Sequence, residues 1–211
     1  MTDRRKLALA APPRDLAGFP RIRRPRRLFR AHAARNGPWW FSSSMDGRFD
    51  LAGPSGTCYL ASDPVTALRE RLGPTLAGTG VVYDFDVENV VISRLRAPAG
   101  PPIADTAAAS AVDFGVTREI CTTIDYCLTQ MWAAELHAAR FGGIRYQPRL
   151  STSATTFSFA FFGPAGAGSY PVDTAPTRAR DVAALAGIRV LETPGRSEVR
   201  VVSPPGPAAH R

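Results

Sequence analysis

A strand that runs directly into a helix is indicated by residues 57–74, which read TCYLASDPVTALRERLGP. The first five of these residues form a short apolar run of the kind found in β-strands. Asp63 can cap a helix N-terminus, and Pro64 suits the first helical turn. Gly73 and Pro74 then predict where the helix ends. This junction lies in the first third of the chain and predicts a short helix entered straight from a strand.

Other strand-like runs occur on both sides of this junction, each bounded by glycine, proline or polar residues. The strongest is 156–162, where Phe157, Phe159 and Phe161 alternate with smaller side chains at the period of two that a strand requires. The remaining runs are 27–32, 39–43, 81–87, 90–94, 143–146, 188–191 and 198–202.

Helices are fewer than strands. Residues 117–139 contain neither proline nor glycine and predict a long helix, and a third helix is expected over 177–185. Residues 95–111 carry three prolines and are expected to form a loop. Because the elements do not alternate as βαβ units, the sequence predicts an α+β fold, and 211 residues suit a single domain.

The net charge of +8 is concentrated in one place. Residues 1–35 hold eleven basic and two acidic side chains, whereas the rest holds 15 basic and 16 acidic ones. Residues 1–25 also carry four prolines and no apolar period, which predicts an extended basic arm with little to bury, followed by a folded domain over 26–211. Because 25 of the 26 basic residues are arginine in a chain rich in Ala, Gly and Pro, the arm is interpreted as a solvated leader, and a nucleic-acid partner is not expected.

Several functional classes have no support in the sequence. No apolar stretch reaches the roughly 20 residues that cross a bilayer, and the apolar run after Met1 is too short for a secretion signal, so a cytoplasmic location is expected. The three cysteines and three histidines have no metal-ligand spacing, so no metal is expected. The patterns GxSxG, GxxxxGK[ST] and GxGxxG after a strand are also missing.

The candidate functional residues occur as a series of short motifs. The chain has Arg30 within LFRAH, then GRF at 47–49, CYLA at 58–61, and Glu70 on the short helix. Further along, WAAELH at 132–137 leads into GGIRY at 142–146.

In this order and spacing, the motifs resemble those of the RES-domain family over about residues 26–163. The resemblance implies a fold similar to that of ADP-ribosyltransferase toxins, with a split β-sheet core around an NAD cleft. It also implies cleavage of the bond between nicotinamide and ribose, with NAD as the substrate, no metal, and transfer of ADP-ribose to inorganic phosphate or to water. Members of this family are toxins paired with Xre-like antitoxins, so such a protein is an expected partner.

The resemblance assigns roles to individual residues. Glu70, Arg48 and Tyr59 are the expected catalytic residues, and Arg30, Arg48, Phe49, Tyr59 and Thr129 are expected to bind NAD. A carboxylate suits the oxocarbenium-like state of this cleavage, and arginine forks suit a pyrophosphate. The slot in which relatives carry a hydroxyl residue reads YQPR here, with Pro148 where serine would stand, so Thr129 and Ser151 are its candidate substitutes.

Each assignment has a structural alternative when the pattern is taken alone. Val65, Leu68 and Leu72 form one stripe of the short helix, and Glu70 lies nearly opposite, where a solvated charge is common. Arg30 would then be a structural ion pair and Tyr59 a core aromatic. Two other functions also stay open: a non-enzymatic binding module with an inert cleft, and an ADP-ribosyltransferase that modifies a macromolecule.

Overall fold

The computed structural model describes residues 8–151, 153–195 and 197–199, and its centre is an eight-stranded sheet. Neighbouring strands are antiparallel, except that β7 (Ile103–Asp105) and β8 (Gly143–Tyr146) run parallel. In spatial order the strands are β1 (Arg21–Ile22), β7, β8, β9 (Ser158–Pro164), β4 (Ser55–Ala61), β2 (Arg27–Ala33), β6 (Val90–Arg96) and β11 (Thr177–Arg178).

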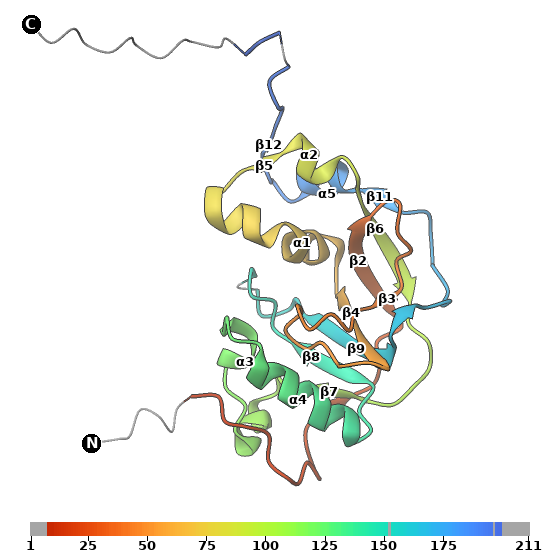
Figure 1. Cartoon of the computed structure of the whole chain (residues 1–211), viewed down its shortest axis with the longest axis vertical. Helices are drawn as coiled ribbons and strands as arrows, with labels where there is room; N and C mark the ends of the chain where they lie inside the picture. The colour runs from red at the N-terminus through yellow and green to blue at the C-terminus, as the bar shows by residue number, and fades with distance from the viewer. Residues whose placement is uncertain (1–7, 152, 196, 200–211) are drawn as a thin grey trace, which may run out of the picture.

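The sheet is split between β4 and β2. These two strands are paired only at Phe29 and Ala61, whereas β4 pairs with β9, and β2 with β6, along seven positions each. In Figure 1, β2, β6 and β11 form one part of the sheet, and β4, β9, β8 and β7 form the other. The expected split β-sheet core is therefore confirmed.

Helices cover the two parts of the sheet separately (Figure 1). The β2–β6 part packs against α1 (Pro64–Thr79), α2 (Asp84–Val87) and α5 (Ala179–Leu185), and the part that contains β8 packs against α4 (Cys127–Ala138). Shorter elements complete the fold: the 3-10 helix η2 (Ala109–Phe114), α3 (Glu119–Thr122), the pair β3 (Trp40–Phe41) with β10 (Gly166–Ala167), and the parallel pair β5 (Val82–Tyr83) with β12 (Val190–Leu191).

The alternating phenylalanines of β9 separate two parts of the core. Phe159 and Phe161 pack with Leu60 on one face of the sheet, whereas Ala160 and Phe162 pack with the cluster around α4 on the other. The prediction of a strand with period two is therefore confirmed, with the strand shifted by two residues. The chain is a single α+β domain.

The predicted end of the first helix is wrong. Asp63 caps α1 through its Oδ1, which accepts a hydrogen bond from the backbone N–H of Thr66 at 2.8 Å. The helix nevertheless continues through Gly73 and Pro74 and ends only at Gly80, which takes the left-handed conformation with φ of 68°. Packing against the sheet and α5 outweighs the local breaking tendency of the Gly-Pro pair.

Three other predictions also differ from the structure. The run 81–87 is a strand only at β5 and then forms α2, whose N-terminus is favoured by Asp84 and Asp86 in the first turn. The helix expected over 117–139 is divided into α3 and α4, and Asp125 accepts a hydrogen bond from the N–H of Cys127 where α4 begins. The expected loop 95–111 contains β7, and most of the run 198–202 lies outside the described residues.

The expectation that residues 1–25 bury little is wrong for the described part of that segment. Phe19 is 2% exposed and Leu9 7% exposed, and both belong to the core cluster around α4. Arg21 and Ile22 form β1 at the edge of the sheet and pair with Ala104 and Ile103. Single large apolar residues anchor this segment, and a search for periodic apolar faces does not detect them.

Candidate active site

A cavity of about 550 Å³ opens where β2 and β4 part. Its walls come from both sides of the split, from α1, from the loop that contains Arg48, and from β8 and β9 with the segment between them. Arg30, Arg48, Tyr59 and Glu70 all line this cavity, although they are spread over 41 positions of the chain. The expected convergence of these four residues is thus confirmed.

Glu70 is the acidic side chain of α1 that faces the cavity. The opposite side of the helix buries Leu68 and Leu72 against α5 and the β2–β6 part of the sheet. Burial raises the pKa of Glu70 above its ordinary value, and the backbone amide of Leu150 and the charge of Arg48 offset only part of this effect. The carboxyl group is therefore a desolvated group in a cavity, and not a solvated charge on an open helix face.

Arg48 stands on a loop that is attached to α4. Its Nη1 donates a hydrogen bond to the carbonyl of Thr123 at 2.7 Å, and its guanidinium stacks on the ring of Tyr126 at 4.8 Å from the ring centroid. The loop backbone is held by Gln130, whose Nε2 donates to the carbonyl oxygens of Met45 and Gly47. These contacts fix the guanidinium at the cavity wall.

Tyr59 is part of a buried hydrogen-bonded group beneath the same loop. Its hydroxyl donates to Asp50 Oδ1 at 2.8 Å and accepts from the backbone N–H of Phe49 at 2.8 Å. Burial, followed by the nearby charge of Asp50, raises the pKa of Tyr59 well above its usual range. Tyr59 therefore remains a neutral phenol that offers its ring to the cavity and uses its hydroxyl to hold the loop.

Asp50 and Gly47 complete this hydrogen-bonded group. Asp50 is 1% exposed and also accepts from the N–H of Gly47 at 3.1 Å and from Ser42 Oγ at 3.0 Å. A Cβ atom on Gly47 would lie 2.4 Å from both Asp50 Oδ1 and Tyr59 Oη. Sequence analysis gave Asp50 no role, because its partners Ser42 and Tyr59 lie on other segments.

Arg30 bridges the split in the sheet. Its Nη1 donates to the carbonyl oxygens of Pro38 at 2.8 Å and Trp40 at 2.9 Å, and lies 3.1 Å from Cys58 Sγ on β4. One nitrogen of the guanidinium, Nη1, is thus used in contacts within the protein. The remaining nitrogens, Nε and Nη2, have no hydrogen-bond partner in the described part of the chain, and the residue is part of the cavity lining.

Phe49 and Thr129 do not line the cavity. Phe49 is fully buried, with its ring centroid 5.0 Å from that of Tyr146. Thr129 is also fully buried, and its Oγ1 donates to the carbonyl of Arg48 at 2.6 Å and to that of Tyr126 at 3.0 Å. The expectation that these two side chains contact NAD is therefore replaced by a positioning role: they support the loop that carries Arg48.

Comparison with known proteins shows the family and the fold to which this chain is similar. The RES domain, as a protein family, matches residues 24–182, which is most of the chain. This protein belongs to the RES-domain family. A solved structure, that of the M. tuberculosis MbcT-MbcA toxin-antitoxin complex, includes a chain with a similar fold, with a TM-score of 0.62, 11% sequence identity, and coverage of 79% of this chain and 92% of that chain. Among curated proteins, no match was found.

At the position after β8 where other RES domains were expected to carry a hydroxyl-bearing residue, this protein has a residue without a hydroxyl. The segment after β8 places Arg149 and Leu150 in the cavity wall, whereas Ser151 Oγ is engaged with Thr156 Oγ1 at 3.0 Å. Since the Thr129 hydroxyl is also engaged, neither proposed substitute presents a free hydroxyl to the cavity.

Sequence analysis gave no role to several polar residues that line the cavity of this RES domain. Arg71 and Arg149 add positive charge to the wall, and Tyr146 and Ser158 add two hydroxyl-bearing side chains. Arg149 and Tyr146 stand in or next to the GGIRY motif, which could have drawn attention to them. Ser158 occupies a small-residue position of an alternating strand and gave no signal.

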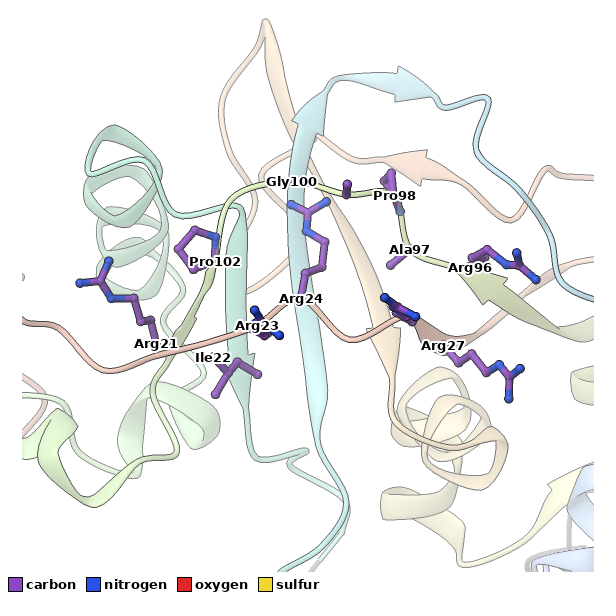
Figure 2. Close-up of a pocket in the computed structure, with 12 residues that line it drawn as sticks. Arg21, Ile22, Arg23, Arg24, Arg27, Arg96, Ala97, Pro98, Gly100 and Pro102 are labelled. Atoms are coloured by element: carbon purple, nitrogen blue, oxygen red, sulfur yellow. The ribbon is translucent and has the colours of Figure 1, made fainter.

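A second hollow of the RES domain, a groove of about 850 Å³, lies between residues 21–27 and the loop after β6. Figure 2 shows its arginines along the groove, with Arg21 and Arg27 pointing away from each other. Asp173 pairs with Arg27 and Arg96 at one end. The groove shares no lining residue with the cavity and is called the arginine groove below. Its lining arginines are Arg21, Arg23, Arg24, Arg26, Arg27 and Arg96.

The described residues lack two further kinds of feature. None of their helices is long and apolar enough to cross a bilayer. They contain no group of three or more His, Cys, Asp or Glu side chains arranged to hold a metal ion.

Proposed function

We propose that this RES domain binds NAD in the cavity at the sheet split and cleaves the bond between nicotinamide and ribose. The observation that carries the proposal is the desolvated Glu70 carboxyl in a cavity that also presents Arg48 and the Tyr59 ring. A volume of about 550 Å³ is within the range of cavities that hold ligands of this size.

Glu70 is the group that would stabilise the reacting ribose. When the bond breaks, its electron pair leaves with nicotinamide and positive charge develops on the ribose ring. A carboxylate held in a site of low dielectric stabilises that charge more strongly than it would in water. The raised pKa of Glu70 is consistent with such a site, and the ionised form is the one that would act.

The arginines of the cavity would hold the pyrophosphate. Arg48 is held by Thr123 and Tyr126, so little conformational entropy is lost when its free guanidinium nitrogens bind an anion. Arg30 would contribute Nε and Nη2, the guanidinium nitrogens that do not bridge the split in the sheet. The Tyr59 ring provides an apolar wall against which a nicotinamide ring can stack.

We further propose that inorganic phosphate, or else water, attacks the ribose carbon to which nicotinamide was attached. Phosphate forms a new C–O bond there and yields a phosphorylated ADP-ribose, whereas water yields ADP-ribose. The additional arginines of the wall, Arg71 and Arg149, provide positive charge that favours an anionic acceptor. In this proposal NAD is a substrate, and no metal takes part.

The fold likeness to a chain of a toxin-antitoxin complex supports a biological role as the toxin of such a pair. An Xre-like antitoxin is the proposed protein partner, and NAD consumption within the cytoplasm would be the toxic effect. Nucleic acid is not proposed as a partner.

The test is to incubate the purified full-length protein with NAD, with and without inorganic phosphate, and to separate the products by chromatography. We expect nicotinamide to be released, together with a phosphorylated ADP-ribose when phosphate is present. Intact NAD under both conditions, and with an added protein acceptor, would favour a binding module. ADP-ribose attached to the added protein would identify an ADP-ribosyltransferase.

A further inference from the structure

Ser158 presents a buried hydroxyl that has no partner. The residue is 1% exposed and lines the cavity, and its Oγ makes no hydrogen bond with any described residue. Leaving a buried hydroxyl unpaired is unfavourable, because the group has lost its hydrogen bonds to water without replacement. A methyl side chain at this position would avoid that cost, so the unpaired hydroxyl needs an explanation.

Tyr146 places a second hydroxyl-bearing side chain beside it. Tyr146 on β8 and Ser158 on β9 are direct partners in the antiparallel register, so both side chains stand on the same face of the sheet. The two hydroxyls are neighbours, but their approach does not have hydrogen-bond geometry. The Tyr146 side chain is 6% exposed and also lines the cavity.

Glu70 lies near this pair of hydroxyls. Burial raises the pKa of Tyr146 well above its ordinary value, and the charge of Glu70 adds to the effect, so Tyr146 stays a neutral phenol that can donate a hydrogen bond. Tyr146 and Ser158 can each donate or accept, and the Glu70 carboxylate can accept. The three side chains thus form one polar surface of the cavity.

Three other hydroxyl groups in this region already have partners. Tyr59 donates to Asp50, Thr57 Oγ1 donates to the carbonyl of Phe49 at 2.7 Å, and Thr129 donates to the carbonyl of Arg48. Within the described residues, Ser158 therefore differs from the hydroxyls that hold the protein together, because its buried hydroxyl has no protein partner.

We infer that Tyr146 and Ser158 bind the vicinal diol of the ribose that carries nicotinamide, on the polar surface they share with Glu70. A pair of adjacent hydroxyl groups matches a pair of side-chain hydroxyls, because each member can donate one hydrogen bond and accept another. The inference rests on the proposed function for the identity of the ligand, and it assigns recognition of the diol to two residues outside the sequence-predicted set.

The test measures binding of carba-NAD, in which a methylene replaces the oxygen of the nicotinamide-side ring so that the compound is not cleaved by this route. A second ligand is the same compound without the diol on that ring. Calorimetry on the full chain would compare wild type with Ser158→Ala and with Tyr146→Phe. We expect each substitution to weaken binding of the diol compound about tenfold, the loss of roughly one hydrogen bond, and to change binding of the diol-free compound less than about twofold.

Several outcomes would overturn the inference: equal weakening of both ligands, which indicates a structural role, no change for the diol compound, or no binding of carba-NAD to wild type. If one variant does not fold, the other still provides the comparison. NAD cleavage is assayed separately on wild type. Cleavage with no effect of either variant on binding rejects only the diol contact, whereas diol-dependent binding without cleavage rejects only the proposed reaction.

Discussion

The cavity at the sheet split and the arginine groove both carry several arginines, but their surroundings differ. In the cavity the arginines lie with the partly buried carboxyl of Glu70 and two neutral hydroxyl-bearing side chains. In the groove no described acidic residue is part of the lining, and Asp173 pairs with Arg27 and Arg96 from one end.

The way in which the arginines are held also differs. Arg48 is fixed by a carbonyl and an aromatic ring, and the loop behind it is tied to α4 and to Asp50. In the groove, Arg23 and Arg26 are exposed and form no ion pair with any described residue. A count of arginines therefore does not locate the reactive site. A desolvated carboxyl facing fixed arginines is the more informative feature.

The largest expected effect is on the stability of the segment that forms the groove. Phe19→Ala removes a ring that packs against Phe114, Trp132 and Phe141, with centroid distances of 5.0, 6.0 and 5.9 Å. We expect the free energy of unfolding to fall by about 3–5 kcal/mol in chemical denaturation. Leu185→Ala, at an 82% exposed position, is the control and should change it by less than about 0.5 kcal/mol. A loss below about 1 kcal/mol for Phe19→Ala would mean that the segment is only loosely attached.

The next effect concerns turnover in the cavity. Glu70→Gln keeps the shape of the side chain but removes the charge proposed to stabilise the ribose, so the rate of NAD cleavage should fall about 100-fold or more. Steady-state kinetics would measure it, with Glu135→Gln on the exposed face of α4 as the matched control. Similar rates for the two variants would remove Glu70 from the reaction.

A smaller effect is expected on affinity. Arg48→Lys keeps a positive charge but loses the planar fork and its stacking on Tyr126, so NAD should bind about tenfold more weakly while the rate at saturation changes less. Arg189→Lys at an exposed position is the control. The prediction fails if the affinity of Arg48→Lys equals that of wild type.

The smallest effect is expected in the groove. The double variant Arg23→Glu with Arg26→Glu reverses two exposed charges, and since the groove shares no lining residue with the cavity, NAD turnover should stay within about twofold of wild type. A tenfold loss with unchanged stability would show that the groove takes part in NAD binding, and the contrast drawn here would then be wrong.

Local patterns predicted the elements that depend on local chemistry. The GIRY strand occurs where it was expected, Asp63 caps α1, and Phe159 and Phe161 of β9 share one face. The approach of Arg30, Arg48, Tyr59 and Glu70 was expected from the order of the family motifs. Periodicity alone indicated a solvated Glu70, because it cannot show that a second wall faces that side of α1.

The features that were missed depend on contacts between distant segments. β7 is a strand because it lies between β1 and β8, and Phe19 is buried because α4 and η2 cover it. The role of Asp50 requires Ser42, Gly47 and Tyr59 around it, and the unpaired state of Ser158 is visible only when its neighbours are known. Such contacts leave no periodic trace in the sequence.

The most direct test of the account is a crystal structure of the Glu70→Gln variant with NAD. Slow turnover should keep the substrate intact during crystallisation. We predict that the nicotinamide-side ribose lies beside residue 70 and the Tyr59 ring, with the pyrophosphate on Arg48. NAD bound in the arginine groove, or an empty cavity at saturating NAD, would contradict the claim that the split in the sheet forms the active site.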